Sequence, residues 1–349
     1  MTKLNLQMFA NMNTQTTLLG TANSNPAEWG GTGLSAEMKT FYDMTLIDEA
    51  QANLVHDQFG QKRNIPANGG KKIEFRKFAA LPKATTPLTE GVTPDGNSLD
   101  VSTIEATVKQ YGDYIVQSDV LELTSIDNTI VEATKLLGRQ AGLTLDTVVR
   151  EYLNAGTNVS YAPKVVDGVE TEVASRANLD ATCKLTVDLV YKMMTKLRAV
   201  NAPTISGDYV CLLHPYVAHD LMRDEEWIEA HKYATPENIY KGEIGKIGNV
   251  RFVQSSEAKI FRGTDDNCPD GLAVFSCLFM GADAYGVTEI EGGGLETIVK
   301  QKGSAGTADP LDQRSSVGWK GMRTAEILIP AYLIRCEVCS SYSATAQAN

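Results

Sequence analysis

Two segments with alternating polar and apolar residues, separated by a stretch rich in proline and glycine, constrain the fold of this chain most. The first runs from Lys71 to Phe78, after the turn-forming Asn68-Gly69-Gly70, and the second from Leu99 to Tyr114. A period of two is typical of half-buried strands, so the segments predict the two strands of a long β-hairpin. Prolines and glycines within residues 82–98 predict a flexible tip.

Such a hairpin reaches far from its base. Ten extended residues at about 3.3 Å each carry the tip roughly 30 Å away. A two-stranded ribbon alone is only marginally stable in water, so it needs another surface to lie on. The sequence therefore favours a subunit that assembles with other chains over a monomeric enzyme.

The rest of the chain mixes helices and strands. Apolar periodicity predicts helices over 45–59, 127–153 and 187–200, the second about 40 Å long, and it places His56 on the solvated back of the first. Strands are expected over 208–214, 250–253, 273–280, 285–289 and 325–338, with a weak hairpin near Gly168. Because helices and strands do not alternate regularly, we expect an α+β fold.

Charge and composition exclude some classes of protein. Asp and Glu total 43 against 32 Lys and Arg, giving a net charge of −11, which argues against a main role in gripping nucleic-acid phosphates. No apolar stretch is long enough to predict a membrane-spanning helix, and the N-terminal residues are too polar for a secretory signal. We therefore expect the six cysteines to be reduced in a cytosolic setting, with Cys336 and Cys339 in the core rather than on a metal.

Catalytic and metal-binding motifs are missing from the sequence. No phosphate loop, dinucleotide fingerprint or nucleophile elbow is present, and the spacing of His214, His219 and His231 does not match a metalloprotease. His214 is expected to be a hydrogen-bonded structural residue. The two acidic clusters, 95–100 and 265–270, lack the closing glutamate of a calcium loop and are expected to be solvated. We therefore predict no enzyme activity and no cofactor.

The first hairpin strand is basic, but its charges alternate between both faces and Glu74 interrupts them. This favours ion pairing between subunits over binding of nucleic acid. We predict contacts between subunits at six hairpin residues: Lys71, Lys72, Arg76, Lys77, Glu90 and Asp95.

At this point the chain resembles the major capsid proteins of tailed bacteriophages. The resemblance covers roughly residues 40–340, and its specificity comes from the order of the parts rather than from one motif. The segments that carry it are Arg63–Lys71, Phe75–Leu81, Thr86–Gly91, Gln110–Tyr114, Leu136–Gln140, Gly242–Val250, Gly318–Lys320 and Ala325–Leu328.

The resemblance implies a Hong-Kong-ninety-seven-like fold with five parts. These would be an N-terminal arm with a helix (1–64), an E-loop β-hairpin (65–121), a P-domain with a long spine helix (122–180), an A-domain (181–300) and strands that return to the P-domain (301–349).

It also implies a function. Such chains form pentamers and hexamers of an icosahedral virion shell that encloses double-stranded DNA, and they are made in the host cytoplasm. An acidic inner wall would not trap the packaged DNA. The N-terminal segment is too short and polar to act as a built-in scaffold, so we expect a separate scaffolding protein, a portal and no membrane partner. Lys83 is a conceivable donor for an isopeptide bond, but no acceptor can be assigned and we expect no cross-linking.

Two other functions stay open from the sequence. A bacterial nanocompartment shell has the same fold but encloses an enzyme, and a neighbouring cargo gene would favour it. A hydrolase would use His214 or an acidic loop, and a His214 substitution that leaves assembly intact, in a protein that also lacks activity, would leave this alternative unsupported.

Overall fold

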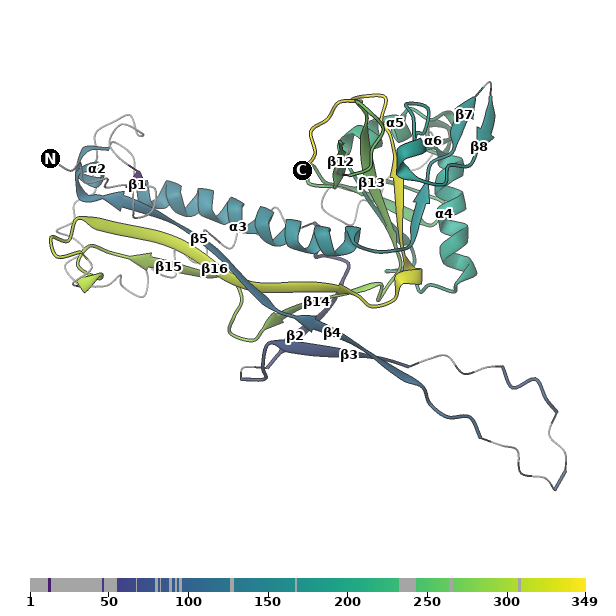
Figure 1. The fold of residues 1–349 in the computed structure, drawn as a ribbon, viewed down its shortest axis with the longest axis horizontal. Coiled ribbons are helices and arrows are strands. Elements are labelled where there is room, and N and C mark those ends of the chain that lie inside the picture. Colours follow the sequence, from purple (N-terminus) through teal and green to yellow (C-terminus); the bar gives the residue numbers. More distant parts are fainter. Residues whose placement is uncertain are drawn as a thin grey trace.

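The computed structural model describes residues 12–13, 46, 55–66, 68–78, 81, 83–87, 90–91, 93, 96–125, 129–166, 168–231, 243–263, 266–306 and 309–349. Figure 1 shows three regions: an elongated layer of one sheet and one helix, a rounded domain at one end, and a thin hairpin that projects from the middle. Helix and sheet are mixed without regular alternation, so the α+β prediction is confirmed.

The elongated layer is built on one long strand, β16 (Arg314–Ile327). β5 (Lys109–Ser118) pairs antiparallel with it along one edge, whereas β15 (Glu296–Lys300) and β14 (Tyr285–Ile290) share the other edge. β2 (Gln61–Ile65) pairs parallel with β14, and β1 (Met12–Asn13) pairs parallel with the end of β5.

One face of this sheet is covered by α3 (Thr129–Asn154), which confirms the helix expected over 127–153. Its buried stripe follows i+3 and i+4 steps from Ile130 through Leu137 and Leu145 to Leu153. Leu136 and Leu143 lie outside this stripe, although both are apolar: Leu136 is 60% exposed and Leu143 is also exposed. A short helix, α2 (Asp119–Thr124), precedes α3, and Ser118 caps it by accepting from Leu121 N.

The rounded domain has a mixed sheet in the order β10 (Glu243–Ile247), β11 (Val250–Gln254), β9 (Tyr209–Leu213), β13 (Ala273–Met280), β17 (Leu333–Val338) and β6 (Val159–Tyr161), with β12 (Ile260–Arg262) also on β13. Every residue of β13 is buried. The same domain carries α4 (Val187–Ala199), α5 (Pro215–Met222), α6 (Glu225–His231), the hairpin β7 (Lys164–Val166) and β8 (Val169–Thr171), and the 3₁₀ turns Arg176–Asn178 and Pro330–Tyr332.

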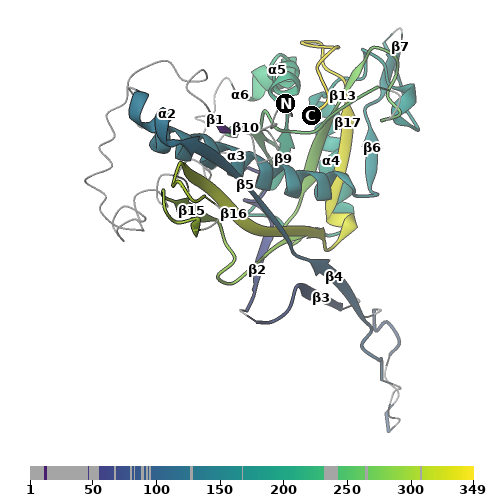
Figure 2. The ribbon, with the colours of Figure 1, turned by 60° about the vertical axis from the view of Figure 1, so that its left-hand side comes forward.

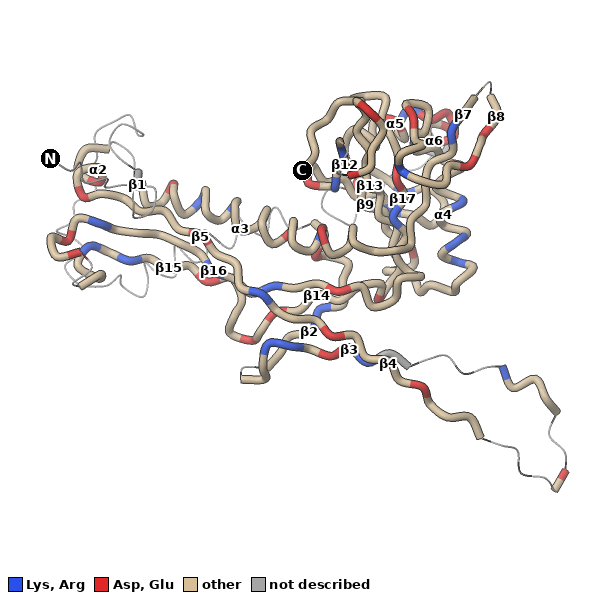
Figure 3. Tube along the Cα trace, viewed as in Figure 1, with Lys and Arg blue, Asp and Glu red and all other residues tan. Residues whose placement is uncertain are grey.

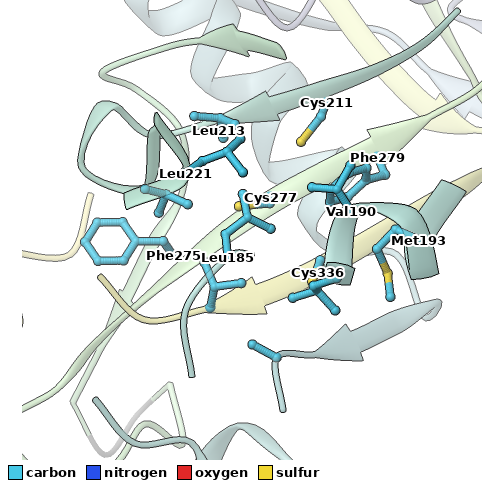
Figure 4. Packing of buried hydrophobic residues seen from close by; sticks show 14 of the residues in the cluster. Leu185, Val190, Met193, Cys211, Leu213, Leu221, Phe275, Cys277, Phe279 and Cys336 are labelled. Atoms are coloured by element: carbon cyan, nitrogen blue, oxygen red, sulfur yellow. The ribbon is translucent and has the colours of Figure 1, made fainter. Parts of the chain in front are cut away.

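Figure 4 shows side chains from α4, β9, β13 and β17 meeting in one apolar core. Met193 and Val190 of α4 enter this core, which agrees with the apolar face expected for the third helix. All six cysteines are free and buried, so the expectation of core thiols, Cys336 and Cys339 included, is confirmed.

The projecting hairpin consists of β3 (Lys72–Phe78) and β4 (Val101–Thr107), paired antiparallel from Lys72↔Thr107 to Phe78↔Val101. The second strand was expected to run unbroken from Leu99 to Tyr114, which is wrong. It breaks at Val108, which is buried and donates its N–H to Lys71 O at 2.9 Å. Beyond the break, β5 pairs with β16 instead, because that long strand offers it ten consecutive partners.

Two further expectations need correction. The strand expected over 325–338 is two strands, because β16 ends at Ile327 and a 3₁₀ turn intervenes before β17. In the helix expected over 45–59, Leu46 is helical but Val55–Gly60 forms a turn, and the intervening residues lie outside the described part of the chain.

Of the helices that the structure describes, none is both long and apolar enough to cross a membrane.

Candidate functional site

The hairpin is attached to the body by a small apolar contact at its base. Phe75 and Ala106 are buried together with Leu328, just past the end of β16, and Ile73 and Ile104 pack beside them. Gly286 of β14 makes room for the Phe75 ring, since a Cβ there would lie 2.8 Å from its Cζ. The hairpin therefore has one anchored face near its base only.

Further out, the hairpin leaves the body. Figures 1 and 2 show it projecting away from both the elongated layer and the rounded domain. Leu81 is 54% exposed, Leu99 is 67% exposed, and Val101 is exposed as well. Exposed apolar side chains on an isolated ribbon are typical of a surface that another chain covers.

Charged residues on the hairpin gather at its base, and Figure 3 shows few of them on its described outer part. Lys72 donates to Glu105 across the two strands at 2.8 Å. This hydrogen bond raises the pKa of Lys72 and lowers the pKa of Glu105. One of the six predicted contact residues therefore already has a partner within its own hairpin.

The other five predicted contact residues remain predictions. Lys71, Arg76 and Glu90 are exposed, as a contact surface requires. Asp95 and the side chain of Lys77 lie outside the described residues. The structure thus brings the basic residues to the base of the hairpin and Glu90 to its outer end.

A second site joins the N-terminal segment to the body, and sequence reasoning missed it. His56 is 1% exposed, so its predicted place on a solvated helix back is wrong. Its Nδ1 lies 2.6 Å from Asp146 Oδ2 on α3, and the N–H groups of Val55 and His56 donate to Asp146 Oδ1 at 2.9 and 2.8 Å. Tyr285 OH donates to the His56 carbonyl. The turn at 55–60 makes this possible, because it aims His56 at α3 rather than at solvent.

The next residue extends this anchor to the sheet. Asp57 is buried, and its carboxylate lies 2.6 Å from Arg323 on β16 and 3.3 Å from Lys62 on β2. Arg323 also lies 3.1 Å from Glu289 on β14. A sequence signal for this site did exist: Asp146 occupies the apolar stripe of α3 between Leu145 and Val149, and a buried carboxylate requires a partner.

The histidine considered for catalysis has a structural place. His214 Nδ1 accepts a hydrogen bond from Tyr216 N at 3.2 Å and caps α5, and its ring packs against Phe275. Burial lowers the pKa of His214 to about 4. The expectation of a hydrogen-bonded structural histidine is confirmed.

The buried thiols are unreactive, and the described carboxylates form no metal site with them. Burial raises the pKa of Cys268 to about 11 and of Cys336 and Cys339 to about 12, so these thiols are not nucleophiles at neutral pH. Within the described part of the chain, no three His, Cys, Asp or Glu side chains group so as to hold a metal ion.

Comparison with known proteins shows which family the chain resembles. A family described as phage capsid protein matches residues 100–333. The major capsid protein of Pseudomonas phage KPP21 is 23% identical over 207 residues, which are 52% of each chain, so the match spans about half the length of that relative.

Several solved phage capsids have similar folds. The capsid of Ralstonia phage GP4 superposes with a TM-score of 0.62 at 16% identity, covering 83% of this chain and 90% of that one. The capsid of cyanophage Pam1 gives 0.63 at 13% identity, covering 84% and 93%. The acid-stable capsid of Helicobacter pylori bacteriophage KHP30 gives 0.56 at 14% identity, covering 97% and 99%. The Hong-Kong-ninety-seven-like fold expected from the sequence is thereby confirmed, and with a family match over two thirds of its length the chain belongs to the phage capsid protein family.

Proposed function

We propose that this chain is the major capsid subunit of a tailed phage and that it assembles into pentamers and hexamers of an icosahedral shell around double-stranded DNA. The observation that carries the proposal is the projecting hairpin: among its described side chains, the buried ones lie at its base, and exposed apolar ones lie beyond the body. A sister copy supplies the surface that this ribbon needs.

The five-part division expected from the sequence belongs to the same proposal. In it, the arm holds on to the body through His56 and Asp57, the hairpin reaches a neighbour, and α3 stiffens the elongated layer. The net charge of −11 keeps the shell from binding the packaged DNA tightly. A separate scaffolding protein and a portal complete the assembly, and the subunit is made in the host cytoplasm. The role proposed is structural, without catalysis.

Assembly of purified protein tests this function. The chain is expressed alone and with candidate scaffolding genes from its own locus, then examined by light scattering and negative-stain electron microscopy. We expect closed shells or capsomers whose mass rises with protein concentration. A chain that remains monomeric at every concentration, with and without those genes, would contradict the proposal.

A variant that replaces residues 81–99 with a short Gly-Ser turn tests whether the outer part of the hairpin is needed for assembly. It keeps the anchored base of the hairpin, including Phe75 and Ala106, so it should fold like the parent chain. It should assemble poorly, because the reach to a neighbour is lost. Assembly equal to that of the parent would show that the contacts between copies are made by other surfaces.

The comparisons above name phage capsids, so no observation favours the nanocompartment.

A further inference from the structure

A cavity of about 220 Å³ lies at the base of the hairpin, between β2, β3 and the residues after β16. Its apolar wall consists of Phe75, Ile104, Leu328 and Ile329. The volume is enough for one large side chain and part of a neighbouring residue. A cavity of this composition suits an aliphatic side chain presented from outside.

The remaining wall carries more positive than negative charge. Arg63 and Arg76 line the cavity together with one carboxylate, Asp283. The Arg63 guanidinium lies 6.0 Å from the centre of the Phe75 ring, directly over the apolar wall. Among the described residues, no carboxylate makes a salt bridge with either arginine. The cavity therefore fits an aliphatic residue that is followed or preceded by an acid.

The chain itself displays such a pair at another place. Leu311 is 76% exposed in the loop between β15 and β16, and the exposed Asp312 follows it. The loop is held by its own contacts: Asp309 accepts from Arg314 N at 2.8 Å, and Asp312 N donates to Asp309 O at 3.1 Å. A leucine held outward by an ordered loop gains free energy when another surface buries it.

The pair cannot reach the cavity of its own chain. Leu311 and Asp312 precede the first residue of β16, whereas Leu328 and Ile329 follow the last one. Fourteen extended residues hold the two places on the order of 40 Å apart, and Figure 1 shows the loop at the far end of the elongated layer from the hairpin base. Only a second copy can bring the two together.

We propose that Leu311 of one copy enters the hairpin-base cavity of a second copy, with Asp312 paired to Arg63 and the positive wall. This contact rests on the proposed function, and it adds to that function by naming the surface of the second copy that is bound. The two surfaces differ, so the contact is heterologous and leaves each copy with one used and one free surface until a ring or shell closes. Apolar burial supplies affinity, and the ion pair fixes the register.

Charge exchange between the two surfaces tests the contact. Leu311→Thr, Asp312→Asn and Arg63→Glu should each raise the concentration at which half the protein enters shells by at least about tenfold. Asn tolerates the positive φ of 51° at position 312, so that variant keeps the loop conformation. The double variant R63E/D312K should assemble at a concentration well below that required by R63E alone. Thermal unfolding of each variant checks the fold.

Matched controls separate this contact from a general loss of solubility or charge. Val169→Thr removes an exposed apolar residue elsewhere, and Asp270→Asn an exposed loop carboxylate; each should change assembly by less than about twofold. Normal assembly of all three test variants overturns the proposal. Rescue of R63E by Glu90→Lys but not by Asp312→Lys also overturns it, and assigns the cavity to the hairpin tip.

A photo-cross-linking amino acid at position 311 gives a readout that does not need complete shells. In whatever oligomer forms, it should label peptides containing residues 61–76 or 328–329 of another copy. Labelling elsewhere overturns the contact while leaving the proposed function intact. A parent chain that never associates contradicts the proposed function itself, and the contact falls with it.

Discussion

The rounded domain and the projecting hairpin are made by the same chain but are stabilised in opposite ways. In β13 of the rounded domain all eight residues are buried, whereas among the described side chains of β3 and β4 the buried ones are Phe75 and Ala106. The first region buries its apolar surface internally. The second exposes Leu81 and Leu99 far from the body, and in the proposed function other copies cover them. Stability and assembly are thus assigned to different regions.

The largest expected effect is in the core of the rounded domain. Phe279→Ala deletes a fully buried ring of β13 and should lower the free energy of unfolding by about 3–5 kcal/mol, measured by urea denaturation. The matched variant Phe75→Ala removes the same atoms at the hairpin base. It should loosen the hairpin, seen as faster proteolysis there, with little change in the main transition. Equal losses in the main transition would break the comparison.

The next effect concerns the anchor between the N-terminal segment and the body. His56→Ala leaves the buried carboxylate of Asp146 without its side-chain partner and should cost about 3 kcal/mol in the free energy of unfolding. Asp146→Asn keeps an oxygen acceptor for the two N–H groups, so its cost should be about 1 kcal/mol. If both substitutions leave the unfolding transition unchanged, the anchor does not contribute to stability.

A third effect depends on pH and should be confined to the rounded domain. The pKa of His214 is about 4 in the folded chain, below its ordinary value of 6.5, because burial disfavours the charged ring. The unfolded chain therefore binds the proton first, and the stability that neutral His214 gives above pH 6.5 is lost as the pH falls through about 4.

His214→Asn, which keeps a capping acceptor, should flatten this slope by about 2 kcal/mol between pH 7 and pH 4. The parallel variant His219→Asn alters a more exposed ring and should leave the slope in place. Unfolding curves measured at half-unit pH steps compare the two. A slope that survives His214→Asn would place the acid sensitivity elsewhere.

The smallest effect on stability should accompany a clear effect on assembly. Leu99→Ser alters a side chain that is already exposed, so the free energy of unfolding should change by less than about 0.5 kcal/mol. Shell formation should nevertheless require more protein, because a neighbour no longer buries that leucine. Unchanged assembly would remove this residue from the proposed contact surface and would narrow the hairpin's role to its base.

Local patterns were enough to predict much of this fold. The periodicity of α3 and α4 and the alternation in β3 and β4 are carried by neighbouring residues. The structure contains all four elements, although the second hairpin strand ends at Thr107. The same patterns predicted the hairpin, which is the main candidate site. They succeeded because each of these elements shows one apolar side to the rest of the chain.

Other features depend on contacts between distant residues and could not be predicted. Gly318 lowers the strand propensity of the segment that forms β16, so the local sequence argues against a strand there. The glycine is needed nevertheless, because a Cβ at position 318 would lie 2.7 Å from Tyr114 Cβ on β5. The position of Asp146 in an apolar stripe indicates that it needs a partner, but nothing local indicates that His56, ninety residues away in the chain, supplies it. The break at Val108 depends on β16 competing for the second hairpin strand.

The burial of all six thiols has a consequence for a particle made of many identical copies. In a shell, neighbouring copies lie at a very high effective concentration. Exposed thiols on two copies would therefore readily oxidise to a disulfide under oxidising conditions. All six cysteines are buried within their own subunit, and burial raises the pKa of Cys336 and Cys339. No thiol is therefore available to form a disulfide with another copy. In such a particle, disulfide bonds between copies would therefore not fix a misplaced subunit.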